Sequence, residues 1–263
     1  MEKANQYLEN YYNTHDEDRR LLSRTGQVEY VVTIEYIHRY LFPGCRVLEI
    51  GAGTGRYSHA LAKEGFSVTA VELVERNVEI LNANTKHGED LTVLQGNAKD
   101  LSFLEDERFD ITLLLGPMYH LYTEEEQIQT LSKALRVTKK GGKVFAAYLN
   151  NDATVVQFCF GKGMLADERY KALVEPETFK CSSTPAELFQ MYRKEDIDAL
   201  MDHFNVRRLH YLGTDMFTLY MPEAVEKMDD ELFSEYLRYV LSICEREDMA
   251  GVTNHILDIF EKL

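Results

Sequence analysis

Short apolar runs alternate with longer amphipathic stretches through the first 150 residues of the chain. The apolar runs have the length and composition of buried β-strands, and they lie at 47–50, 67–72, 91–95, 109–115 and 143–149. The stretches around them have a helical pattern, at 27–41, 57–64, 75–85 and 124–137. Because strands that alternate with helices form parallel sheets, the pattern predicts a doubly wound α/β fold.

The pattern changes after residue 150. From there to about residue 204 it favours helices, one of them signalled by the capping sequence TPAE at 184–187. Residues 205–212 and 255–261 resemble strands, with a long helix between them at 229–247. We therefore predict three parts, which are an N-terminal helical lid at 1–43, a core from 44–149 and 204–263, and an inserted helical cap at 150–203.

Composition and charge narrow the possible partners. The 263 residues are 45% hydrophobic, which is enough to build a full core. Asp and Glu total 44 against 29 Lys and Arg, so the formal charge is −15. The average field of such a protein repels nucleic-acid phosphates. DNA and RNA are therefore not expected as partners.

The cysteines and the N-terminus suggest the compartment. Cys45, Cys159, Cys181 and Cys244 include no C-x-x-C pair, which argues against a zinc site and a disulfide framework. We therefore expect reduced thiols and no metal. The first 20 residues lack a continuous apolar segment, and no run approaches the roughly 18 apolar residues of a membrane span. These features predict a cytoplasmic protein that does not cross a membrane.

The turn after the first predicted strand contains the motif that most clearly indicates a ligand-binding site. In the sequence VLEIGAGTG at 47–55, Glu49 is followed by Gly51, Gly53 and Gly55. Glycines in such a turn let backbone N–H groups approach a ligand closely. The residue after Gly55 is Arg56, so the third glycine comes one position too early for the dinucleotide fingerprint G-x-G-x-x-G.

The second predicted strand ends in an acidic residue, Glu72, about twenty residues after the glycine turn. A carboxylate at this position can accept hydrogen bonds from both hydroxyl groups of a ribose. The glycine turn and Glu72 together predict a site for a ligand that contains adenosine.

Five stretches resemble the successive motifs of the seven-stranded class I S-adenosylmethionine-dependent methyltransferases, namely 47–58, 68–72, 96–98, 109–115 and 138–144. The turn GPMYHL at 116–121 is similar to the G-P-L-Y-H-L turn of a bacterial small-molecule branch of that superfamily, and so are Tyr11-Tyr12, Arg20-Leu21 and the closing 254–257. The resemblance implies a mostly parallel, seven-stranded Rossmann-like sheet, S-adenosylmethionine as cofactor, S-adenosylhomocysteine as product and a small-molecule acceptor.

The resemblance also implies roles for individual residues. Glu72 and the adjacent Leu73 would hold the ribose, and Asn97 and Ala98 would face the adenine. The family commonly has Asp at the position of Asn97, and an Asn oxygen can accept the same amino hydrogen. Gly51, Gly53 and Gly55 would line the methionine and the ribose. Leu115 and Gly116 would offer backbone carbonyls to the methionine ammonium, and Glu49 would orient that end through water or loop N–H groups.

Methyl transfer needs an acceptor held in line with an activated donor, and a base where the acceptor carries a proton. His120 is the candidate base or acceptor-orienting group, and Tyr119 beside it is a candidate to stack on the acceptor. The alternative is that both simply stabilise the turn. The candidate lid and acceptor-pocket residues are Tyr11, Tyr12 and Arg20 in the N-terminal segment, and Phe158, Phe160, Met191 and Tyr192 in the cap.

Three other functions stay compatible with the sequence. An NAD(P)-dependent oxidoreductase would share the sheet and the ribose carboxylate, although the glycine spacing and the 116–121 turn count against it. An RNA-modifying methyltransferase conflicts with the acidic charge. A non-catalytic binding module would retain the fold without turnover. The sequence does not specify the acceptor or the oligomeric state.

Overall fold

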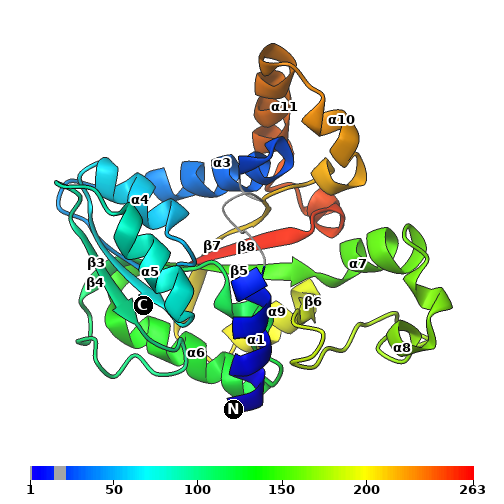
Figure 1. Ribbon diagram of the computed structural model, residues 1–263, viewed down its shortest axis with the longest axis horizontal. Helices are drawn as coiled ribbons and strands as arrows, with labels where there is room; N and C mark the ends of the chain where they lie inside the picture. Colours follow the sequence, from blue (N-terminus) through cyan, green and yellow to red (C-terminus); the bar gives the residue numbers. More distant parts are fainter. Residues whose placement is uncertain (1, 15–21) are drawn as a thin grey trace.

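The computed structural model describes residues 2–14 and 22–263 and contains one central sheet (Figure 1). Its strands are β1 (Arg46–Ile50), β2 (Ser67–Glu72), β3 (Leu91–Gln95), β4 (Phe109–Leu114), β5 (Thr138–Asn150), β6 (Met191–Tyr192), β7 (Val206–Gly213) and β8 (His255–Lys262). In the described residues the order is β3-β2-β1-β4-β5-β8-β7, with the short β6 also paired to β5. The strands from β1 to β5 run parallel, and β8 is antiparallel to both of its neighbours.

Helices cover both faces of the sheet (Figure 1). They are α1 (Glu2–Thr14), α3 (Arg24–His38), α4 (Arg56–Lys63), α5 (Glu75–Asn84), α6 (Glu124–Val137), α7 (Asn151–Thr154), α8 (Glu168–Lys171), α9 (Lys194–Met201), α10 (Pro222–Glu226) and α11 (Asp230–Ile243). A short 3-10 helix, η1 (Pro117–His120), follows β4, and a π-helical turn, η2 (Val155–Phe160), follows α7. No helix within the described ranges has the length and apolar character needed to cross a bilayer.

The alternation of side chains along each strand divides the core between the two faces. Val47 belongs to a buried cluster with Val32 of α3 and Val240 of α11. Leu48, the next residue, belongs to a second cluster with Leu131 of α6 and Leu200 of α9. Because successive strand residues point to opposite faces, the two clusters form separate layers of one α/β sandwich.

The predicted fold class is confirmed. Each of the five strands expected before residue 150 is present, as are the later strands at β7 and β8 and the long helix α11. Local signals in the sequence account for several helix ends: Thr123 caps α6 by accepting from the backbone N–H of Glu126, and Asp229 caps α11 in the same way. The left-handed Gly65, with φ of +93°, lies just beyond α4 as expected.

The helix predicted from the capping sequence at 184–187 is wrong. Residues 185–187 form a turn, and residues 188–190 directly after it are not helical. Leu188 has φ of +72°, which is incompatible with a right-handed helix. The carbonyl of Leu188 instead lies 2.9 Å from Nδ1 of His120 and accepts from the hydroxyl of Tyr122 at the same distance. Tertiary hydrogen bonds thus replace the helical ones that the local sequence favours.

The segment between β5 and β7 extends to one side of the molecule. It contains α7, η2 and α8, which lie at the end opposite β3 and β4 (Figure 1). The chain then returns to the sheet through β6 and α9. Ile197 and Leu200 of α9 are buried in the same cluster as α6, so the last part of this segment packs against the central sheet.

The first strand–helix turn brings backbone close to the edge of the sheet. Gly51 and Gly55 have φ of +72° and +91°, a region that favours glycine. A Cβ on Gly51 would lie 2.7 Å from Cγ of Pro117, and a Cβ on Gly55 would lie 2.7 Å from Cγ of Leu81. These glycines therefore satisfy both a backbone conformation and a close approach between segments.

Gly55→Ala is expected to lower the free energy of unfolding more than Gly44→Ala does. Gly44 also has a positive φ, of +82°, but no atom lies within 4 Å of its added Cβ. We expect a loss of about 1 kcal/mol at Gly44 from backbone strain and about 3 kcal/mol at Gly55, where overpacking against Leu81 adds to it. Urea unfolding measures both values. Equal losses would mean that Leu81 moves aside without cost.

Candidate functional site

A cavity of about 180 Å³ opens at the carboxyl ends of β1, β2 and β4. This is the sheet edge at which open α/β folds bind ligands. It brings together most of the residues predicted to bind the cofactor and act on the acceptor. The predicted residues that line it are Glu49, Gly51, Gly53, Glu72, Leu73, Asn97, Ala98, Leu115, Gly116, Tyr119 and His120.

Gly55 does not line this cavity. It precedes the first residue of α4, and its α-carbon faces Leu81 and His59. The third glycine of the motif therefore contributes to packing of α4 against α5, while Gly51 and Gly53 face the cavity.

Glu72 lies at the end of β2 with a relative exposure of 6%. One carboxylate oxygen accepts from the backbone N–H of Gly53 at 2.8 Å, and the other accepts from that of Val74 at 2.8 Å. Burial raises the pKa of Glu72, and these hydrogen bonds oppose that effect. A carboxylate can accept about four hydrogen bonds, and a third, longer one comes from the amide of Asn77 at 3.4 Å, so Glu72 retains capacity for a ligand hydroxyl group.

Glu49 lies at the end of β1 and is also buried. Its carboxylate accepts a hydrogen bond from the hydroxyl of Ser58. Burial raises the pKa of Glu49 to about 7, and the charge of Glu72 adds to that rise. A cationic ligand group beside Glu49 would favour its ionised form.

Asn97 lines the cavity from the segment after β3. Its side-chain oxygen accepts from the backbone N–H of Lys99 at 2.9 Å, which fixes the orientation of the amide. The ammonium of Lys99 donates to the carboxylate of Glu126 at 2.7 Å, and both side chains also line the cavity. The wall expected to face an adenine therefore includes an ion pair as well as an amide.

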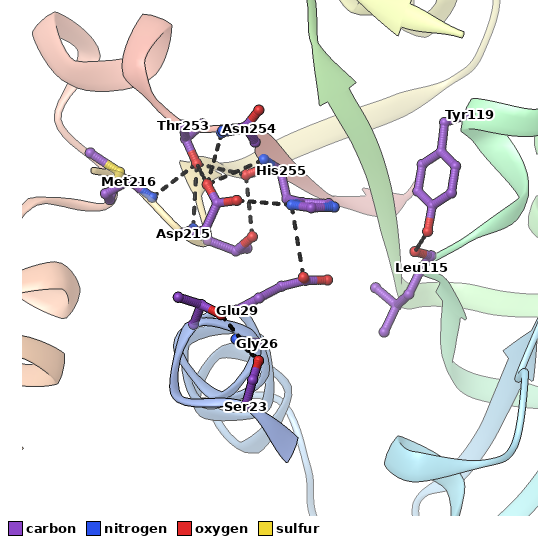
Figure 2. A network of polar contacts seen from close by, with 12 residues as sticks. Ser23, Gly26, Glu29, Leu115, Tyr119, Asp215, Met216, Thr253, Asn254 and His255 are labelled. Atoms are coloured by element: carbon purple, nitrogen blue, oxygen red, sulfur yellow. Dashed lines mark hydrogen bonds and ion pairs between the residues drawn. The ribbon is translucent and has the colours of Figure 1, made fainter. Parts of the chain in front are cut away.

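Leu115 follows β4, and its backbone carbonyl borders the cavity. The hydroxyl of Tyr119 donates to this carbonyl at 3.2 Å, as Figure 2 shows. A carbonyl oxygen has two lone pairs, so it can also accept from a ligand ammonium. Tyr119 thus lies directly against the group predicted to hold the methionine end.

His120 is held at both ring nitrogens. Nε2 lies 2.9 Å from the hydroxyl of Tyr12, and Nδ1 lies 2.9 Å from the carbonyl of Leu188. Because a carbonyl only accepts, Nδ1 carries the hydrogen, and Nε2 of the neutral ring accepts from Tyr12. Burial lowers the pKa of His120 to about 4. The ring is therefore neutral at pH 7 and suited to orienting its neighbours.

Two of the predicted lid residues lie on α1. The ring of Tyr12 meets that of His120 edge to face at 5.7 Å, and Tyr11 meets Phe189 at 5.6 Å. These contacts join the N-terminal helix to η1 and to the segment before β6. Arg20, the third predicted lid residue, lies outside the described residues.

A second cavity, of about 490 Å³, adjoins the first. Tyr12, Glu29 and Tyr119 line both, so the two cavities share a wall. Two of the four residues proposed to shape an acceptor pocket, Phe158 and Met191, line this second cavity.

The other two proposed pocket residues lie elsewhere. Phe160 is 61% exposed, and Tyr192 is buried in the core, where its hydroxyl donates to the carbonyl of Met118 at 2.7 Å.

The sequence interpretation missed several residues at the site. Glu29 lies on α3 in an ordinary amphipathic pattern, so only the packing of α3 brings it to the shared wall. Asn77 donates to Glu72 from α5 at 3.4 Å. The spacing of Lys99 and Glu126, 27 residues apart, likewise gives no local signal that they pair.

Known methyltransferases resemble this chain in sequence and in fold. A family model described as a methyltransferase domain matches residues 47–142. The ubiquinone biosynthesis O-methyltransferase of Caulobacter vibrioides is 32% identical over 110 residues, which are 41% of this chain and 42% of that protein. The ubiquinone biosynthesis O-methyltransferase of Hahella chejuensis is 22% identical over 200 residues, covering 73% of this chain and 81% of that protein.

A solved structure gives the fold over nearly the whole chain. The S-adenosylmethionine-dependent methyltransferase of Thermotoga maritima, described as a possible histamine N-methyltransferase, superposes with a TM-score of 0.62 at 20% identity. The match covers 98% of this chain and 99% of that one. Residues 47–142 therefore match a methyltransferase domain, and the chain has the Rossmann-like fold of that S-adenosylmethionine-dependent methyltransferase.

Proposed function

We propose that this protein transfers the methyl group of S-adenosylmethionine to a small-molecule acceptor. The observation that carries the proposal is the pair of adjoining cavities. The first contains the Glu72 carboxylate and the glycine turn, and the second shares three wall residues with it. A cofactor in the first cavity would have a possible acceptor site directly beside it.

The hydrogen-bond acceptors that line the first cavity match the donor groups of the cofactor. Glu72 can accept from the ribose hydroxyls, and the carbonyl of Leu115 can accept from the methionine ammonium. Glu49 adds a carboxylate on the same side, whose negative charge would be stabilised by that ammonium. Asn97 would accept from the adenine amino group.

The chain's contribution to the reaction is to bind, orient and exclude water. When bound, S-adenosylmethionine supplies an activated methyl group on a sulfonium, so the protein need not supply a nucleophile. Tyr12 and Tyr119 at the shared wall would hold the acceptor in line with that methyl group. The hydrogen bond between Tyr12 and His120 would keep α1 over the site as a lid.

The size of the second cavity and the charge of the protein support a small acceptor. About 490 Å³ falls in the range of small-molecule sites. The two relatives named above are called ubiquinone biosynthesis O-methyltransferases, which agrees with a small organic substrate. The formal charge of −15 disfavours a nucleic-acid acceptor. A cytoplasmic location belongs to the same proposal.

The remaining alternatives fit less well. A nicotinamide-dependent oxidoreductase would need a glycine directly after Gly55, and Arg56 occupies that position. The guanidinium of Arg56 lies over the ring of Tyr30, 4.2 Å from its centroid.

Ligand binding is the first test of the proposal. We expect S-adenosylmethionine and S-adenosylhomocysteine to raise the melting temperature, while NAD and NADP leave it unchanged. At a hundredfold excess over the dissociation constant, the stabilisation should be about 2.7 kcal/mol. A response to NAD or NADP alone would favour the oxidoreductase, and no response to any of the four would contradict cofactor binding.

Glu72→Gln is expected to weaken binding of S-adenosylhomocysteine by about 10-fold to 100-fold, because a charged acceptor for the ribose is lost. Calorimetry measures the affinity, and the melting temperature of the ligand-free variant checks the fold. Glu79→Gln is the matched control, since it makes the same charge change on the exposed side of α5. Unchanged affinity in Glu72→Gln would remove the ribose assignment.

Cofactor affinity is expected to rise with pH through the titration of Glu49. Its pKa of about 7 in the ligand-free protein leaves it mostly protonated at pH 6. The ligand ammonium interacts better with the ionised form, so affinity should increase about tenfold from pH 6 to pH 7.5. Calorimetry at both pH values tests this, and Glu49→Gln should remove the dependence. An equal slope in that variant would assign the titration to another group.

A further inference from the structure

A second histidine lies beside the proposed acceptor cavity and is held by a buried carboxylate. His255 is the first residue of β8, and its Nδ1 lies 2.9 Å from Oδ2 of Asp215. Asp215 follows β7 and has a relative exposure of 2%. Both side chains line the second cavity. The two residues are 40 positions apart, so the sequence gives no local signal that they pair.

Asp215 is fixed in place by the chain around it (Figure 2). Its Oδ1 accepts from the hydroxyl of Thr253 at 2.6 Å and from the backbone N–H of Asn254 at 2.8 Å. These bonds leave Oδ2 directed at the imidazole of His255. The carboxylate therefore does not need to reorganise when the histidine changes its protonation state.

The contact with Asp215 determines the tautomer of His255. An ionised carboxylate only accepts, so Nδ1 carries the hydrogen and Nε2 of the neutral ring has the basic lone pair. A second carboxylate, Glu29 of α3, has an oxygen 3.8 Å from the same Nδ1. Two negative groups on one side of the ring stabilise the imidazolium that forms when Nε2 takes up a proton.

The sheet places His255 at the correct edge for catalysis. β8 is antiparallel to β5, and His255 pairs with Leu149 near the carboxyl end of β5. β4, which leads to Leu115, is the next strand on the other side of β5. β8 and β4 are two inter-strand spacings apart, which is about 10 Å across the sheet. Figure 2 shows the ring directed from β8 toward the side where Leu115 and Tyr119 lie.

The second cavity combines a largely apolar surface with negatively charged side chains. Its lining is largely aliphatic and aromatic, with carboxylates from Glu29, Glu187 and Asp215. Among the described residues, no Lys or Arg side chain lines it. The described lining by itself would repel a carboxylate or phosphate on the acceptor, whereas it would accommodate a neutral or cationic molecule with an apolar body.

His120 is less suited to act as a base than His255. Both of its ring nitrogens face Tyr12 and Leu188, and its pKa of about 4 makes it a weak proton acceptor at pH 7. His255 differs in that carboxylates, rather than a carbonyl, face its Nδ1.

We propose that His255 is the general base of the methyl transfer, with Asp215 as its positioning residue, and that the acceptor is a neutral or cationic small molecule with a hydroxyl or amine in a largely apolar body. This inference rests on the proposed function and specifies its acceptor site. Nε2 of His255 takes the proton from the acceptor oxygen or nitrogen, whose electron pair forms the new bond to the methyl carbon. The electrons of the broken carbon–sulfur bond remain on sulfur, and the proton later passes to water.

The acceptor class is tested with phenols and amines offered in neutral, cationic and anionic forms. One matched set is 4-methylcatechol, dopamine and 3,4-dihydroxyphenylacetate, which share a catechol ring and differ in charge. Formation of S-adenosylhomocysteine measures turnover. We expect the neutral and cationic compounds to be methylated and the anionic ones to react at least about tenfold more slowly. Turnover confined to anionic compounds, or with no member of the panel, would overturn the acceptor assignment.

His255→Gln is expected to lower kcat by about a hundredfold or more with the best acceptor of that panel. The KM for the acceptor and the dissociation constant of S-adenosylhomocysteine should change less than about threefold, since binding does not need the proton transfer. Added imidazole should restore part of the activity of His255→Ala. His38→Gln is the control, because His38 also pairs with a carboxylate, Glu64, but on the surface.

Asp215→Asn tests the positioning role. The amide oxygen can still accept from Thr253 and Asn254, while the amide nitrogen cannot accept from Nδ1 of His255. We expect kcat to fall about tenfold or more with an unchanged melting temperature, and Asp215→Glu to recover part of the loss.

The outcomes separate this inference from the proposed function. Unchanged kcat in His255→Gln, or no rescue by imidazole, would overturn the base assignment while binding of S-adenosylhomocysteine still supported the methyltransferase. A protein that does not bind S-adenosylhomocysteine at all would overturn the proposed function and this inference together.

Discussion

The site depends on one buried carboxylate that ties two strand–helix turns together. Glu72 accepts from the backbone of Gly53 in the turn after β1 and of Val74 in the turn after β2. These turns come from adjacent parallel strands, so the bonds fix their relative position at the sheet edge. A buried carboxylate is costly unless it is hydrogen bonded, and the two N–H groups meet that requirement. The cavity lies between the two turns that these hydrogen bonds hold in place.

The sheet order then separates the cavity proposed for the cofactor from the cavity proposed for the acceptor. The cavity with Glu72 lies over β1, β2 and β4, and the second cavity lies over β5 and β8, with Tyr12, Glu29 and Tyr119 between them. The antiparallel β8 is essential to this division, because it returns the start of a late strand to the same edge as the ends of the early ones. His255 and Asp215 reach the site in this way.

The sequence predicted the architecture better than it predicted the site. Strand positions and the capping role of Thr123 depend on neighbouring residues, and these predictions were confirmed. The capping sequence at 184–187 shows the limit of local signals. There, the carbonyl of Leu188 interacts with His120 and Tyr122, and the helix does not form. The lid, the cap boundaries and the roles of individual site residues stay predictions.

The sequence by itself determined the α/β fold and predicted an adenosine-type site at the glycine turn and Glu72, since both follow from contiguous motifs of a few residues. Only the tertiary structure decided how His120 is hydrogen bonded, that Gly55 packs against Leu81, and that Glu29, Asp215 and His255 meet. The physical reason is sequence separation. Contacts between α3, the end of β7 and the start of β8 depend on how the whole sheet closes, and no local pattern of residues encodes them.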